Sequence, residues 1–240
     1  MHSPFVFDFI LNVINNKSNY KCPSEVEQLR KELLSDKRSI EVQDFGAGSR
    51  INSSKRRSVD QIARSALKSK RLAQILFRLV KHYQPQTIVE LGTSLGITTS
   101  YFSKANPNAS ITSIEGSTHV AAIAKESFQK LNCTNIQLLQ GNFDNLLPSV
   151  ISQLSSIDLA YIDGNHRYEP TINYFHQFIT RSNRQTILVF DDIHWSEEME
   201  KAWEEIKSHP SVQYTIDIFF LGFVFFRDEF KVKQNFSIRF

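Results

Sequence analysis

Three aspartates and a histidine stand where predicted strands end. Asp163 follows the apolar run IDLAYI, His166 comes three residues later, and the pair Asp191-Asp192 follows TILVF. Neighbouring parallel strands end at the same edge of a sheet, so the three carboxylates should converge. Like charges packed that closely raise each other's pKa unless a cation lies between them, and hard oxygen ligands suit Mg²⁺, Mn²⁺ or Ca²⁺. The pattern predicts a divalent cation held by Asp163, Asp191 and Asp192, and a cluster that needs no metal is the open alternative.

Two stretches with paired glycines compete as a cofactor-binding loop. The first, DFGAGSR at 44–50, follows a weak strand and precedes RINSSKRRS, which has no apolar helix face. The second lies in IVELGTSLGITTSYF at 88–102, where Gly92 and Gly96 stand between an apolar strand and a helix. A ligand loop in a parallel α/β sheet belongs at the carboxyl end of a strand and opens a helix. The second stretch is therefore the predicted cofactor loop.

The spacing and charge of this loop narrow the choice of cofactor. A dinucleotide site uses G-x-G-x-x-G so that the backbone can approach a pyrophosphate, but here the glycines are four apart and Glu90 precedes them. A carboxylate there repels a pyrophosphate and suits a positively charged, phosphate-free nucleoside such as S-adenosylmethionine (SAM). Glu115 ends the next strand, SITSIE, where an acid holds a ribose diol. For the loop, the alternative is an ordinary strand–helix turn in which Glu90 stands by chance. Nicotinamide sites also hold a ribose with an acid at the end of the second strand, so Glu115 does not distinguish the two cofactors.

Alternating strands and helices from about residue 86 onward must position these side chains. The strands are short, nearly continuous apolar runs, which indicates a parallel sheet covered by helices on both faces: TIVEL, SITSIE, NIQLLQ, IDLAYID and QTILVFDD. The last two strands, VQYTIDI and LGFVFFR, are joined too closely for a crossover helix and should pair antiparallel. We predict a cofactor-binding domain over residues 85–240.

Residues 1–84 have a different pattern and are predicted to form a helical and lid region packed on that core. Apolar or charged periodicity predicts helices at 2–15 and 25–38, and one long helix from about Val59 to Tyr83. The polar, basic stretch 46–58 is predicted to be a loop. It is interpreted as a lid over an acceptor site, with Asp44, Arg50 and Lys55–Arg57 as substrate contacts; a solvated basic loop is the alternative.

Together these pieces resemble the class I SAM-dependent methyltransferases, and within them the small metal-dependent O-methyltransferases of the catechol O-methyltransferase type. The matching motifs lie in the family's order between Thr87 and Arg227: VELGTSLGITT, SIEG, QGNFDNLLP, IDLAYIDGNHRYE and LVFDDIHW. The resemblance implies an α/β, Rossmann-like, seven-stranded and mostly parallel sheet with an antiparallel last strand and helices on both faces. It also implies methyl transfer from SAM to an oxygen of a small-molecule acceptor.

The resemblance assigns roles to single positions, carried over one by one. It implies the following cofactor contacts: Glu90, Gly92, Ser94 and Gly96 at the methionine half, Thr98 at the cofactor's carboxylate, Glu115 and Gly116 at the ribose, Asn142, Phe143 and Asp144 at the adenine, and Asp163 at the reactive end. The carboxylate at Thr98 would lie near a helix N-terminus, where the dipole favours an anion. Core packing is an equal alternative for Phe143.

Two positions depart from the family's pattern. Asp192 stands where the third metal ligand is commonly Asn, and His166 stands in place of the family's lysine base. In the family the cation binds two vicinal acceptor hydroxyls and lowers a hydroxyl pKa. We predict catalytic roles for His166, as general base, and Asp163; His194 is a second candidate base, and a locally hydrogen-bonded loop histidine is the alternative. The aspartate pair is not expected to cap the following helix, because Ser196 is better placed.

Composition sets further expectations. The 240 residues carry a formal net charge of +3 and no apolar run long enough to span a bilayer. Cys22 and Cys133 have no metal or redox spacing and are predicted to be free thiols, so we expect a cytoplasmic protein with no membrane partner. Burial is expected for the Phe-rich run IDIFFLGFVFF, and a homodimer edge is its alternative.

Two rival functions remain open. A nicotinamide-dependent oxidoreductase has a similar sheet, but the missing G-x-G-x-x-G and the charge of Glu90 count against it. The basic residues between Lys55 and Arg78 suggest a non-catalytic SAM-binding or RNA-associated protein. The small net charge of +3 is only weak support for a nucleic-acid partner.

Overall fold

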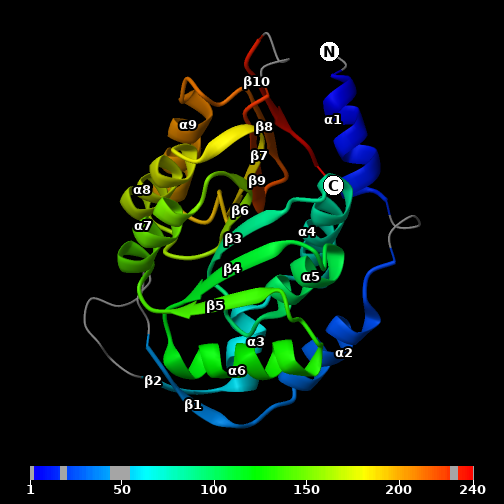
Figure 1. Ribbon diagram of the computed structural model, residues 1–240, viewed down its shortest axis with the longest axis vertical. Coiled ribbons are helices and arrows are strands. Elements are labelled where there is room, and N and C mark those ends of the chain that lie inside the picture. The colour runs from blue at the N-terminus through cyan, green and yellow to red at the C-terminus, as the bar shows by residue number, and fades with distance from the viewer. Residues whose placement is uncertain (1–2, 17–20, 44–54, 228–231, 240) are drawn as a thin grey trace.

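An eight-stranded, mostly parallel sheet forms the centre of the molecule (Figure 1). The computed structural model describes residues 3–16, 21–43, 55–227 and 232–239. The strand order is β10-β8-β9-β7-β6-β3-β4-β5. In chain order the strands are β3 (Thr87–Leu91), β4 (Ser110–Glu115), β5 (Ile136–Gln140), β6 (Ile157–Ile162), β7 (Ser182–Asp191), β8 (Tyr214–Asp217), β9 (Leu221–Phe225) and β10 (Gln234–Ser237).

The direction of the last strands agrees with the sequence prediction. β9 runs antiparallel to both of its neighbours, β7 and β8. For β8 the reason is that only residues 218–220 separate it from β9, and no crossover helix fits between them. The predicted seven strands are β3 to β9. β10 is not among the predicted strands; it adds an eighth strand, parallel to β8, at the edge of the sheet.

Helices cover both faces of the sheet, as predicted (Figure 1). On one face lie α7 (Phe143–Gln153), α8 (Tyr168–Ile179) and α9 (Glu197–Ser208), whose apolar side chains share one core cluster with the strands. On the other face lie α5 (Ile97–Ala105) and α6 (Thr118–Lys130). Ser196 caps α9 by accepting a hydrogen bond from Met199 N at 3.3 Å, which confirms the predicted start of that helix.

The N-terminal helices belong to the same core cluster as α5 and α6. They are α1 (Pro4–Phe9), the π-helix η1 (Ile10–Ile14), α2 (Ser24–Leu33), α3 (Val59–Ala66) and α4 (Lys70–Tyr83). Phe9 is fully buried, and its ring centroid lies 5.0 Å from that of Phe223 and 5.8 Å from that of Phe225 on β9. Residues before 85 therefore cover the sheet directly, while the boundary at 84/85 stays a prediction.

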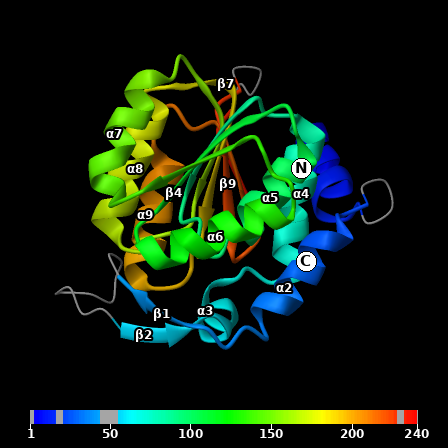
Figure 2. The ribbon, with the colours of Figure 1, turned by 60° about the horizontal axis from the view of Figure 1, so that its bottom comes forward.

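Two predictions for the N-terminal region are wrong. Residues Lys55–Ser58, assigned to a loop, form β2, which pairs antiparallel with β1 (Ser39–Val42). Their charged side chains gave no apolar alternation, and the partner strand supplies the backbone hydrogen bonds that the sequence pattern does not reveal. Figure 2 shows this hairpin beside α3 at the near edge of the molecule.

The second error concerns the helix expected over 59–83. It is interrupted at residues 67–69, where Leu67 is extended and Ser69 starts α4 by accepting a hydrogen bond from Leu72 N at 3.4 Å. Apolar spacing continues across the break, so periodicity alone did not show it. Most of the predicted lid, including Asp44 and Arg50, lies outside the described residues.

Neither Cys22 nor Cys133 forms a disulfide in the described part of the chain, as predicted. Among the described residues, no helix combines the length and the apolar character needed to cross a membrane. Phe223 and Phe225 are buried, as expected for the Phe-rich run, whereas Phe219 and Phe220 are exposed.

Candidate active site

A cavity of about 490 Å³ opens at the carboxyl edge of the sheet, where ligands bind in open α/β folds. Its volume lies in the range of small-molecule and cofactor sites. Loops that follow β3 to β7 supply one wall, through Gly92, Ser94, Glu115, Gly116, Ser117, Gly141, Asn142, Phe143, Asp163, Gly164, Asn165, His166, Asp192 and Trp195. The N-terminal region supplies another, through Val42, Gln43, Arg57, Ile62, Ser65, Ala66 and Lys68.

The cavity brings together most of the residues predicted for the site. Nine of them line it: Gly92, Ser94, Glu115, Gly116, Asn142, Phe143, Asp163, His166 and Asp192. The other five are not among its described lining residues: Glu90, Gly96, Thr98, Asp144 and Asp191. The predicted contacts of both groups with a cofactor or metal stay predictions.

Gly92 fits the turn after β3 for two reasons. Its φ of +102° is a conformation that side chains other than glycine rarely adopt. A Cβ atom at this position would also lie 2.0 Å from the carbonyl oxygen of Asp163. The ends of β3 and β6 are in direct contact here, since Asp163 N donates to the Leu91 carbonyl at 2.9 Å. This contact places the cofactor loop beside the carboxylates.

Glu90 lies behind the loop and is fully buried. Its Oε2 accepts hydrogen bonds from Thr99 Oγ1 and Ser113 Oγ, each at 2.5 Å, while Oε1 has no partner. Burial raises the pKa of Glu90 to about 8, against the opposing effect of the two hydroxyl donors. Near neutral pH Glu90 therefore keeps its proton and lies behind the cavity wall, which contradicts the expectation that its charge repels a pyrophosphate.

Glu115 is the residue predicted to hold a ribose. It ends β4 on the cavity wall, and its two oxygens accept backbone N–H groups of Ser94 at 2.8 Å and Ser117 at 2.9 Å. Burial raises the pKa of Glu115, and these backbone donors oppose the shift. Two fixed donors orient the carboxylate and leave lone pairs on each oxygen for further hydrogen bonds.

The residues predicted for the adenine form the start of α7. Asn142 caps this helix by accepting a hydrogen bond from Asp144 N at 2.8 Å. Phe143 both lines the cavity and packs at the margin of the core, with its ring edge-on to Tyr174. Asp144 accepts a hydrogen bond from the Tyr174 hydroxyl at 2.8 Å. The two interpretations of Phe143 are thus compatible.

The three aspartates do converge, and a lysine stands among them. Lys68 Nζ forms an ion pair with Asp191 Oδ2 and lies 3.8 Å from Asp163 Oδ1 and 3.7 Å from Asp192 Oδ2. Asp191 is fully buried, and burial together with Asp163 raises its pKa. Burial alone would lower the pKa of Lys68, but its attraction to the carboxylates raises it above the ordinary value. The cluster thus contains its own positive charge.

This lysine bears on the predicted metal. Asp163, His166 and Asp191 each bring one ligand atom to within 4.8 Å of the others, a spacing that an ion can bridge. An ion bound by the aspartates needs oxygen atoms at roughly 2.0–2.6 Å, and the Lys68 ammonium is already paired with them. With Lys68 in this position the cluster does not fit a divalent ion. Metal binding by the aspartates stays a prediction, and this geometry does not support it.

Lys68 is not among the predicted site residues, because the apolar spacing predicts a continuous helix through it. The available signal was the polar run KSK at 68–70 followed by a serine-capped helix start. Of the two candidate bases, His166 lines the cavity with Nε2 3.6 Å from Asp163 Oδ1. His194 instead pairs with Asp217 at 2.8 Å and is not among the described lining residues.

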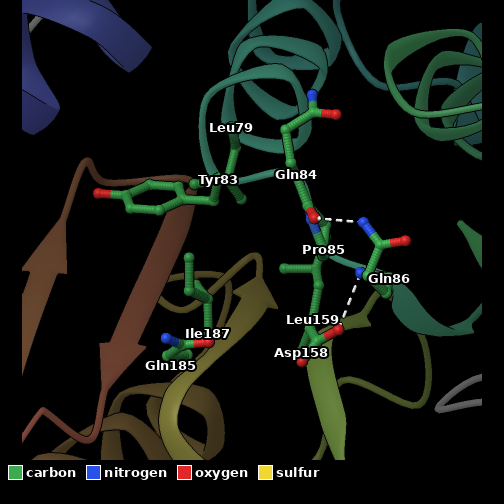
Figure 3. A pocket seen from close by; sticks show the side chains of 9 residues that line it. All are labelled: Leu79, Tyr83, Gln84, Pro85, Gln86, Asp158, Leu159, Gln185 and Ile187. Carbon is green, nitrogen blue, oxygen red and sulfur yellow. Dashed lines mark hydrogen bonds between the residues drawn. The ribbon is translucent and has the colours of Figure 1, made fainter.

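A smaller cavity of about 170 Å³ lies away from these groups, near the amino ends of β3 and β6 (Figure 3). Its acid, Asp158, accepts the backbone N–H groups of Gln86 at 2.8 Å and Thr87 at 3.0 Å. These bonds tie β6 to the start of β3, so the carboxylate has a structural role.

The sequence of this chain is similar to those of known methyltransferases. Residues 89–193 match the model of a methyltransferase domain family. A catechol O-methyltransferase of Niastella koreensis is 26% identical over 133 residues, which cover 54% of this chain and 58% of that protein. The chain thus spans little more than half the length of this curated relative.

Solved structures show the same fold. An S-adenosylhomocysteine (SAH)-bound methyltransferase of Podospora anserina superposes with a TM-score of 0.68 at 13% identity, over 95% of this chain and 98% of that one. An O-methyltransferase of Bacillus cereus in complex with SAH gives 0.61 at 16% identity, over 92% and 97%. The resemblance to class I methyltransferases inferred from the motifs is confirmed, with the fold shared along nearly the whole chain.

Proposed function

We propose that the chain, which carries a methyltransferase domain in residues 89–193, transfers a methyl group from SAM to an oxygen of a small-molecule acceptor. The observation that carries this proposal is the cavity at the carboxyl edge of the sheet, where the Gly92 turn, the Glu115 carboxylate and Asp163 line one continuous wall. The SAH named in the two solved structures of the same fold supports the choice of cofactor.

In this proposal SAM lies along the wall formed by the loops after β3, β4 and β5. Glu115 accepts hydrogen bonds from the ribose hydroxyls, and the start of α7 at Asn142 and Phe143 contacts the adenine. The methionine half lies over the turn at Gly92 and Ser94. Its sulfonium lies near Asp163, whose negative charge favours the cationic donor over an anionic pyrophosphate.

The acceptor occupies the part of the cavity nearest the N-terminal region. Its walls there include Ile62 and the exposed ring of Trp195, which is 73% accessible. Apolar and aromatic walls beside a few polar groups are typical of small-molecule sites. Arg57 is one of the predicted basic contacts, and it lines the cavity. Its positive charge suits an anionic acceptor.

The transfer itself is a single displacement. The acceptor oxygen forms a bond to the methyl carbon as the bond from that carbon to sulfur breaks, leaving a neutral thioether. The acceptor proton passes to His166, the predicted base, which lines the cavity with Nε2 3.6 Å from Asp163 Oδ1. Since the donor is already activated, holding oxygen, carbon and sulfur in line contributes most of the rate.

Several finer expectations accompany this function. A cytoplasmic location, the absence of membrane and nucleic-acid partners, and the alternative of a homodimer all stay predictions. The exposed rings of Phe219 and Phe220 are the surface that a homodimer would be expected to use. The nicotinamide enzyme and the non-catalytic binding protein remain the rival functions.

Calorimetric titration with SAH and, separately, with NAD tests the proposal. We expect one SAH to bind per chain and no heat from NAD. Gly92→Ala should weaken SAH binding at least about tenfold, a loss of roughly 1.4 kcal/mol, because the added Cβ displaces the Asp163 carbonyl. Binding of NAD alone would overturn the assignment, as would SAH binding that Gly92→Ala leaves unchanged.

A further inference from the structure

The position of Lys68 among three carboxylates is the feature that the proposed function leaves unexplained. Its side chain is 11% exposed and lines the cavity, while Asp191, its closest partner, has no exposed surface. A buried carboxylate is costly unless a positive charge or hydrogen bonds compensate it. Among the described residues, Lys68 is the cation that lies within ion-pair distance of all three aspartates.

The backbone around Lys68 is fixed by its neighbours. Its carbonyl oxygen accepts a hydrogen bond from Arg30 Nη1 at 2.6 Å, and the Arg30 side chain is itself paired with Glu27 at 3.0 Å. Ser69, the next residue, caps α4. Three helices thus converge on the break at 67–69 and direct the lysine toward the ends of β6 and β7.

We propose that Lys68 supplies, as a tethered ammonium, the positive charge that a bound divalent cation would otherwise supply to Asp163, Asp191 and Asp192, so that the site works without a metal ion. This inference rests on the proposed function. The ammonium offsets part of the negative charge of the aspartates, most directly that of Asp191, and because it also lines the cavity it presents N–H donors to an acceptor oxygen that is losing its proton. A single flexible cation of this kind does not chelate two vicinal hydroxyls, so acceptors with one hydroxyl are accommodated.

Manganese binding distinguishes a site whose positive charge comes from Lys68 from a site that holds a divalent cation, and the experiment requires no known acceptor. Wild type, Lys68→Ala and the control Lys70→Ala, which removes an exposed lysine two residues away, are treated with chelator and titrated with Mn²⁺. Bound ion is followed by electron paramagnetic resonance. Up to about 1 mM free ion, the weak end of protein cation sites, we expect no stoichiometric binding by wild type or Lys70→Ala. Lys68→Ala should bind one equivalent, with an unfolding midpoint that rises as Mn²⁺ is added.

Two results overturn the proposal. One is a wild type that binds one Mn²⁺ and loses it in Asp191→Asn. The other is a Lys68→Ala protein as stable as wild type that does not respond to Mn²⁺. If Lys68→Ala does not fold, the double variant Lys68→Met/Asp191→Asn decides: recovery of the fold supports charge compensation, and continued failure contradicts it.

SAH titration of the same samples keeps this inference separate from the proposed function. Chelator should change the SAH dissociation constant of wild type by less than about twofold, a difference under roughly 0.5 kcal/mol. A wild type that binds no SAH overturns the methyltransferase assignment, whereas the Mn²⁺ result still reports on Lys68. A chelator-sensitive SAH affinity contradicts the lysine proposal alone.

Discussion

Glu90 and Asp191 are both fully buried carboxyl groups, and each is next to residues that line the cavity. Each has one oxygen without a hydrogen-bond partner, Glu90 Oε1 and Asp191 Oδ1. For both, burial is the largest cause of a raised pKa. They differ in what opposes burial: two hydroxyl groups for Glu90 and the Lys68 ammonium for Asp191. Asp191 thus has a charged partner, whereas the two hydrogen-bond donors to Glu90 are neutral hydroxyl groups.

The raised pKa of Glu90 predicts a pH-dependent stability. The folded protein keeps the proton on Glu90 up to about pH 8, whereas the ordinary value is 4.5, so the wild type becomes less stable as the pH rises between these values. Glu90→Gln cannot ionise. Its unfolding free energy relative to wild type should therefore increase through this window, by up to about 1.4 kcal/mol for each pH unit.

Urea unfolding at several pH values, followed by tryptophan fluorescence, measures this difference. Glu197→Gln, which removes an exposed acid on α9, is the matched control and should show no such trend. A Glu90→Gln difference that stays constant with pH, or grows toward acid, would show that Glu90 is ionised in the folded protein.

At the scale of elements, the break between α3 and α4 matters most. A continuous helix over 59–83 would have buried one apolar stripe equally well, but would not have brought Lys68 to the ends of β6 and β7. The cap at Ser69 and the bond from Arg30 to the Lys68 carbonyl stabilise the interruption. The hairpin of β1 and β2 lies beside it, with Gln43 N donating to Ser117 Oγ at 3.3 Å. These N-terminal elements complete a cavity that the methyltransferase domain alone leaves open on one side.

Removing the cap should loosen this interruption. Ser69→Ala and Ser196→Ala each delete a serine that caps a helix, α4 or α9, and each should cost about 1 kcal/mol of unfolding free energy. Only Ser69→Ala should also free Lys68 from its carboxylate partners. Acetylation of Lys68 by acetic anhydride, followed by mass spectrometry, should become several-fold faster in Ser69→Ala and remain unchanged in Ser196→Ala. Equal rates in both variants would count against a link between the cap and the lysine.

At the scale of the whole molecule, the N-terminal region and the sheet share one apolar core. Phe9 of α1 packs edge-on against Phe223 and Phe225 of β9, and apolar side chains of α1 to α4 share one core cluster with those of the sheet. A separable lid domain would be expected to have its own core. These contacts instead favour one cooperative unit.

Phe9→Ala tests that cooperativity. Burial of the ring predicts a loss of about 3–5 kcal/mol of unfolding free energy. Both tryptophans, Trp195 and Trp203, lie in the C-terminal part of the chain, so their fluorescence reports on the sheet and not on α1. We expect the tryptophan transition in urea to move to lower concentration in Phe9→Ala. The control Phe7→Ala removes a ring that is 64% exposed and should change stability by less than about 0.5 kcal/mol. A tryptophan transition unaffected by Phe9→Ala would support two independently folding parts.

The sequence by itself determined the order of strands and helices from β3 to β9, the antiparallel direction of β9, the glycine loop that lines the cavity and the convergence of three aspartates. Each of these follows from local patterns, namely apolar runs, glycine spacing and acids at strand ends. Only the tertiary structure decided that Glu90 lies behind the wall, that Lys55–Ser58 pairs as a strand, and that Lys68 reaches Asp191. Lys68 and Asp191 are 123 positions apart, and no local pattern encodes a contact between a helix break and the end of a distant strand.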